Sequence, residues 1–87
     1  MTTKKLRRHL AGLTSARGVV ELKGHAYNAE LALLDVEPDD SPGAPADAWR
    51  AAWLIRKRAE ARRAWRDYTA AMRRIRRELD RRQGVAA

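Results

Sequence analysis

The stretch RKRAEARRAWRDYTAAMRRIRRELDRR, residues 56–82, decides the fold because its apolar side chains follow a helical heptad repeat. They recur at alternating intervals of four and three residues, which is the a/d spacing of helices that pack side by side. We call this set the seam: Ala61, Trp65, Tyr68, Met72, Ile75 and Leu79. The seam predicts one long amphipathic helix with a partner helix, interrupted once where Arg58 takes a core position.

The same stretch holds twelve Arg or Lys and four Asp or Glu, so it carries +8, the formal net charge of the whole chain. Neighbouring arginines repel one another unless a polyanion neutralises them, and the guanidinium fork suits phosphate. The expected nucleic-acid contacts are Arg56, Arg62, Arg63, Arg66, Arg73, Arg74, Arg76, Arg77 and Arg81.

Two other readings of these arginines stay open. They are also the solvent side of an amphipathic helix, or they face the acidic middle of their own chain. Residues 24–49 carry six acidic groups and no Lys or Arg, a net charge of −6. Six acids cannot serve every arginine, so internal neutralisation is expected to be partial.

Proline and glycine place the loop. EPDDSPGAPAD, residues 37–47, contains three prolines and a glycine, which interrupt a helix. We expect the loop at 37–45 and the long helix at 46–82, about 55 Å in length. Residues 83–87 are then a tail, with Gly84 ending the helix.

The N-terminal part predicts two shorter helices, at 3–13 and 16–36. Leucines at 6, 10 and 13 and apolar residues from Val20 to Leu34 keep helical spacing, while AGLTSARG at 11–18 weakens the helix between them. A strand at 18–24 is the alternative, but no second strand is evident to pair with it. We favour helix.

AGLTSARGVVELKG, residues 11–24, resembles the turn and recognition helix of a helix-turn-helix motif. That resemblance implies DNA binding through the major groove. Gly18 falls inside the would-be recognition helix, and only one short helix precedes the turn. An ordinary connection between two helices is therefore the preferred interpretation.

The start of the long helix is apolar on nearly all sides. Trp49, Trp53, Leu54 and Ile55 lie within two turns, and such a segment is typical of a buried helix. We expect the two N-terminal helices to enclose it as core or interface.

Composition excludes several classes of function. The chain has no Cys, no apolar run near the roughly 20 residues of a membrane span, and no apolar segment behind its basic start. His9 and His25 have no partner acid in the sequence, and no Gly-rich phosphate loop or hydrolase motif is present. We expect a cytoplasmic protein with no catalytic residue, no metal and no cofactor.

These observations predict an all-α protein: two short helices, an acidic loop and a long basic helix with a coiled-coil-like arm. The expected function is nucleic-acid binding, DNA or RNA, by a small bacterial or phage regulatory or architectural factor that forms a homo-oligomer through the seam. The alternative is an assembly factor that docks on a larger protein through the seam and the tryptophans.

Overall fold

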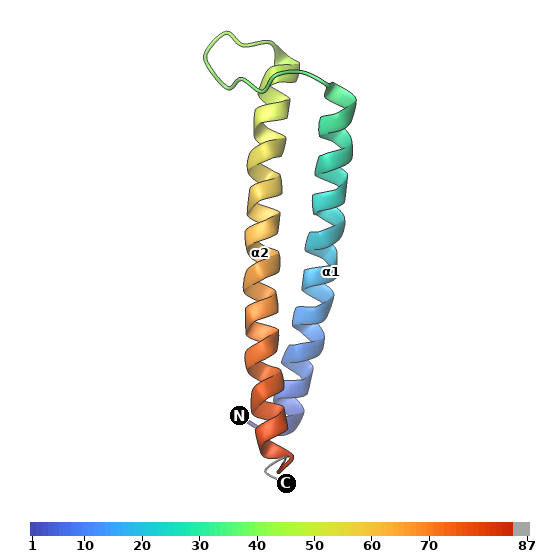
Figure 1. The fold of residues 1–87 in the computed structure, drawn as a ribbon, viewed down its shortest axis with the longest axis vertical. Helices are drawn as coiled ribbons and strands as arrows, with labels where there is room; N and C mark the ends of the chain where they lie inside the picture. Colours follow the sequence, from blue (N-terminus) through green and yellow to red (C-terminus); the bar gives the residue numbers. More distant parts are fainter. Residues whose placement is uncertain (85–87) are drawn as a thin grey trace.

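The computed structural model describes residues 1–84 of the 87-residue chain. It is a hairpin of two antiparallel helices, α1 (Thr3–Leu34) and α2 (Ala46–Arg82). The hairpin measures 62 × 21 × 20 Å, with the start of α1 and the end of α2 at one end and the loop at the other (Figure 1). The all-α prediction is confirmed, and residues 1–84 contain no strand.

The prediction of two short N-terminal helices is wrong, because α1 runs unbroken through residues 11–24. The strand alternative and the helix-turn-helix interpretation fail with it. Thr14 stays within the helix by donating its hydroxyl to the Leu10 carbonyl, at 2.8 Å. One continuous stripe with heptad spacing also spans α1: Leu6, Leu10, Leu13, Arg17, Val20, Gly24, Tyr27, Leu31 and Leu34. Packing of this whole stripe on α2 outweighs the weak helix propensity of the small residues.

Both ends of α1 are capped. The Thr2 hydroxyl accepts a hydrogen bond from the Lys5 backbone N–H at 3.1 Å, as an N-cap residue does. At the other end Asp35 adopts a left-handed conformation, with φ of 46°, and its N–H donates to the Leu31 carbonyl at 3.2 Å. The helix therefore ends at Leu34, two residues before the predicted end.

The loop, residues 35–45, folds back onto the first turn of α2. The Asp39 N–H donates to the Ala48 carbonyl at 3.1 Å, and Nε1 of Trp49 donates to the Ser41 carbonyl at 3.1 Å. Gly43 turns the chain with φ of 86°, a value that favours glycine. These contacts set where α2 begins and fix the loop against the first turn of α2.

The seam faces α1, and the core between the helices is narrow. α2 spans the residues that its sequence predicts. Within the described part of the chain, five side chains are buried, all from α2: Ala48, Ala51, Leu54, Met72 and Leu79. Small and polar residues fill much of the interface, so this core is thin for a chain of 87 residues.

The start of α2 is not enclosed, because one helix rather than two lies beside it. Leu54 is fully buried, but Ile55 is half-buried and Trp49 keeps 44% of its surface exposed. Trp53 is half-buried and meets the ring of Tyr27 edge-on, with 6.2 Å between centroids. The expectation of a helix covered on all sides is therefore wrong.

Neither α1 nor α2, as far as the structure describes them, has an apolar segment long enough to cross a membrane.

Candidate nucleic-acid interface

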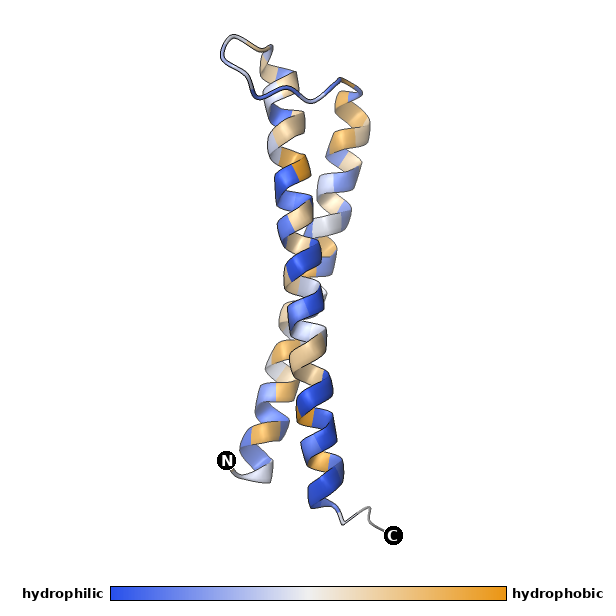
Figure 2. Ribbon diagram, turned by 60° about the vertical axis from the view of Figure 1, so that its left-hand side comes forward, coloured by the Kyte–Doolittle hydropathy of each residue, from blue (hydrophilic) through white to orange (hydrophobic). Residues whose placement is uncertain are grey.

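The arginines predicted to bind nucleic acid are all exposed and form two rows along α2. Residues separated by 4, 7 or 11 positions lie on one side of an α-helix, since it has 3.6 residues per turn. Row A comprises Arg62, Arg66, Arg73 and Arg77, and row B comprises Arg56, Arg63, Arg74 and Arg81. Arg76 lies beside row A, between it and α1. Hydrophilic residues dominate this C-terminal half of α2 (Figure 2).

The acidic residues of α2 lie next to row B. Glu60, Asp67 and Glu78 are separated by 7 and 11 residues, so they form a third line on the helix. Every arginine of row B has Glu60 or Glu78 three or four residues away, close enough for an ion pair. In row A only Arg77 has such a neighbour, Asp80. Charge is therefore divided around α2, and row A lies on its most positive side.

The ion pairs follow the same division. The Glu78 carboxylate accepts a hydrogen bond from Nε of Arg81 at 2.8 Å and another from Nε of Arg82 at 2.9 Å. The hydrogen bond from Arg81, then that from Arg82, lowers the pKa of Glu78 from 4.5 to about 2, and Glu78 raises the pKa of Arg81. No ion pair within residues 1–84 involves row A. Its positive charge stays available to a partner.

The acidic middle of the chain neutralises only the start of α2. Asp40 pairs with Arg56 at 2.8 Å, and Glu30 accepts two hydrogen bonds from Nη2 of Arg50, each at 2.9 Å. Asp39 turns inward to the loop instead. The Ser41 hydroxyl and then the Ser41 N–H donate to it and lower its pKa. Of the nine predicted contact arginines, Arg56 is thus the one that forms an ion pair with the acidic middle of the chain.

The seam residues lie against α1 of the same chain. Met72 is fully buried and Leu79 is 8% exposed, while Ala61, Tyr68 and Ile75 are half-buried. Trp65 keeps 38% of its surface exposed, because its ring reaches the edge of the interface. In the hairpin the seam is thus used within the chain, and Trp65 is its most accessible residue.

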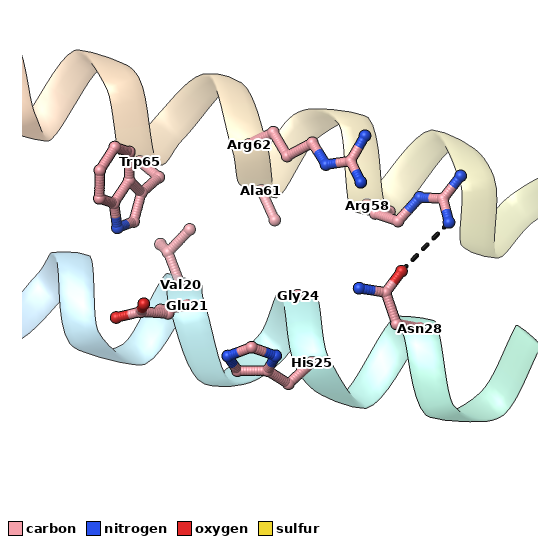
Figure 3. Close-up of a pocket in the computed structure, with 9 residues that line it drawn as sticks. All are labelled: Val20, Glu21, Gly24, His25, Asn28, Arg58, Ala61, Arg62 and Trp65. Atoms are coloured by element: carbon pink, nitrogen blue, oxygen red, sulfur yellow. Dashed lines mark hydrogen bonds between the residues drawn. The ribbon is translucent and has the colours of Figure 1, made fainter.

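A groove opens beside Trp65, where both helices carry small residues at core positions (Figure 3). Gly24 of α1 faces Ala61 of α2, and the space left beside them measures about 220 Å³. The rim is polar, and Arg58 crosses it to donate to Oδ1 of Asn28 at 3.1 Å. The full lining is Val20, Glu21, Gly24, His25, Asn28, Arg58, Ala61, Arg62 and Trp65.

The sequence did not predict this groove, because the groove forms only when α1 and α2 pack in one particular register. The signal in the sequence was the pair of small residues, Gly24 and Ala61, at positions where a heptad repeat usually has large ones. The groove adjoins row A through Arg62. It brings a partly exposed indole, the kind of surface on which a nucleobase stacks, next to the most positive side of α2.

The chain matches no protein-family model, no curated protein and no solved structure, so the function of this surface is argued from its own residues.

Proposed function

We propose that this protein binds nucleic acid through row A of α2, mainly by contacts with the phosphate backbone. The observation that carries the proposal is the position of row A, which is exposed, lies away from the acidic line and makes no ion pair within residues 1–84. A row of guanidinium groups on a rigid helix favours a polyanion, because binding releases the counterions of the phosphates.

The dimensions of row A suit a nucleic-acid backbone. From Arg62 to Arg77 the helix rises about 22 Å. Arginine side chains are long enough to reach phosphates on either side of the axis, and each guanidinium donates two parallel hydrogen bonds to a phosphate. Contacts of this kind fix position without reading bases, so affinity with little sequence preference is expected.

We infer a non-enzymatic, architectural or regulatory role for this binding, in the cytoplasm of a bacterium or a phage-infected cell. The charge and the lack of a catalytic motif in the sequence support that inference. DNA and RNA share the phosphate chemistry on which it rests.

Fluorescence anisotropy with short labelled duplexes of two unrelated sequences tests the proposal. Four to five phosphate contacts give a log–log salt slope of about −3.5 to −4.5. Both sequences should bind with similar affinity and similar slope. A single-stranded probe of the same length shows whether Trp65 and its groove add affinity through base stacking.

Absence of binding to DNA and RNA at low salt would contradict the proposal. The arginines would then be neutralised by an acidic protein, and the assembly-factor alternative would replace nucleic-acid binding. The exposed Trp49 supports that alternative, because exposed tryptophans are enriched where proteins dock.

A further inference from the structure

α1 has a second apolar stripe, on a side that α2 does not cover. Its residues follow one another at intervals of 3, 4, 3 and 4, again a heptad spacing. They are Val19, Leu22, Ala26, Ala29 and Leu33, and all five are exposed. Leu33 keeps 86% of its surface accessible, Leu22 70% and Val19 53%. We call these residues the outer stripe.

The outer stripe distinguishes α1 from an ordinary hairpin helix. A helix with one neighbour has one apolar face, whereas apolar residues on two faces are typical of a helix inside a bundle. The residues of α1 that meet α2, such as Tyr27 and Leu31, lie well around the helix from Leu22 and Leu33. The end of α1 next to the loop is coloured hydrophobic in Figure 2. Leucines left this accessible favour association.

We propose that the outer stripe binds a second copy of this chain, so that two hairpins form an antiparallel four-helix assembly with the two α1 helices at its centre. This proposal does not rest on nucleic-acid binding, because the outer stripe and the arginine rows share no residue.

One antiparallel register pairs four of the five residues of the outer stripe with one another, and it leaves Val19 opposite residue 36 of the second copy, beyond the end of α1. It places Leu22 opposite Leu33 of the second copy, and Ala26 opposite Ala29 of the second copy. Large side chains then meet large ones at both ends, while the alanines let the two backbones approach at the centre. A twofold axis repeats every contact, as closed homodimers require.

The charges beside the outer stripe fit the same register. In an antiparallel pair the flanking positions on one side of the two stripes face each other. Here those positions are Lys23 and Glu30, so Lys23 of each copy lies opposite Glu30 of the other. Glu30 already pairs with Arg50, and 40% of its side chain remains accessible for a further donor. An antiparallel register shifted by one heptad also aligns apolar positions, but it loses both of these pairs, because the twofold axis makes them equivalent.

The size of the outer stripe sets the expected affinity. It extends about 21 Å along the helix, and stable interfaces bury about 800 Å² per partner. A stripe of this length covers less than that, so we expect a dimer that dissociates in the micromolar range. The thin core of the single hairpin gives such a dimer a stabilising role, and the melting temperature should rise with protein concentration.

Disulfide trapping tests the register directly, since the chain contains no cysteine. The variants Leu22→Cys and Leu33→Cys, mixed and oxidised, should give a covalent dimer. Each variant alone should give much less, because its own cysteine lies about 16 Å along the axis from its symmetry mate, beyond disulfide reach. Equal trapping in the separate variants, or none in the mixture, would overturn the proposed register.

Light scattering on nucleic-acid-free protein tests whether the outer stripe is the dimer interface. Wild type should approach twice the chain mass of 9.9 kDa at high micromolar concentration. Leu22→Gln with Leu33→Gln should return the protein to the monomer mass with unchanged helical circular dichroism. The control pair, Ala59→Gln with Ala70→Gln on exposed positions of α2, should leave the dimer intact.

A wild-type protein that is monomeric at every concentration, or a dimer that survives the double Leu→Gln change, would refute the proposal. Neither result bears on nucleic-acid binding, which is measured separately by the salt slope. The net charge is unchanged in the Leu→Gln variants, so a loss of dimer without a loss of salt dependence separates the two proposals.

Discussion

The guanidinium of Arg17 lies over the ring of Trp65, with Cζ 5.2 Å from the ring centroid. Its Nη1 also donates to the Thr69 hydroxyl at 3.1 Å. Arg17 occupies a core position in the stripe of α1, where a leucine would continue the heptad spacing from Leu13 to Val20. The cation–π contact and the hydrogen bond compensate for placing a charged group there.

Arg17→Leu should stabilise the hairpin. The substitution continues the apolar stripe and removes the desolvation cost of a half-buried guanidinium. We expect a gain of about 1 kcal/mol, a rise of about 4–8 °C in melting temperature for a domain of this size. Thermal circular dichroism measures it, with Arg17→Ala as the control that removes the contacts without adding apolar area. A lower melting temperature for Arg17→Leu would mean that the contacts with Trp65 and Thr69 outweigh that cost.

The two arginine rows allow a matched comparison for nucleic-acid binding. Changing all of row A to Gln should flatten the log–log salt slope by about three to four units, because each lost phosphate contact removes about 0.9. Changing all of row B removes the same charge, but two of those arginines, Arg56 and Arg81, already pair with acids. The row B substitutions should therefore reduce the affinity for nucleic acid less than the row A substitutions do. Equal losses from both rows would show that only net charge matters.

Glycines inside α1 should be replaceable with a gain in stability. A Cβ added at Gly24 has no heavy atom within 4 Å, so Ala fits there without rearrangement. Gly24→Ala should raise the free energy of unfolding by about 0.5–1 kcal/mol through helix propensity. Gly43→Ala is the control: its Cβ is equally free, but φ of 86° strains an L-residue, so it should destabilise. Urea denaturation distinguishes the two outcomes.

The core is thin enough that one truncation should be severe. Met72 is fully buried, so Met72→Ala leaves a cavity and should cost about 2–5 kcal/mol. That is a large share of the stability of a small domain. Met72→Leu conserves most of the volume and should cost less than about 1.5 kcal/mol. Should both variants melt like wild type, the contact between α1 and α2 near Met72 would be dispensable.

The end of α2 should lose stability in acid. The pKa of Glu78 is about 2 in the folded chain and 4.5 ordinarily, so folding favours its ionised form. That contribution is complete above pH 4.5 and disappears as the pH falls toward 2. The difference in melting temperature between wild type and Glu78→Gln should therefore shrink over this window. A difference that stays constant from pH 6 to about pH 2 would contradict the contacts with Arg81 and Arg82.

The sequence by itself determined the elements that local chemistry controls. The heptad spacing of Trp65, Met72 and Leu79 predicted α2, and its bounds agree with the structure because prolines and Gly84 frame it. The loop followed from the same prolines. The exposure of the arginines was also predictable, since residues off an apolar face turn to solvent.

Only the tertiary structure decided that α1 is one helix. Locally, Gly12 and Gly18 weaken a helix by about 1 kcal/mol each relative to alanine, which predicted a break. The contacts that keep α1 whole come from the other helix: Arg17 reaches Thr69, which is 52 residues away in sequence. No local pattern reports such a contact.

The neutralisation of charge at the start of α2 was likewise a tertiary result. Glu30 pairs with Arg50 and Asp40 pairs with Arg56 because the loop folds back and sets the register of the helices. That register directs Glu30 and Asp40 to the start of α2, and neither of them pairs with row A. Spacing along one helix gives the rows and places the acidic line beside row B. The pairing of Glu30 and Asp40 with α2 depends instead on distances that only the packed chain sets.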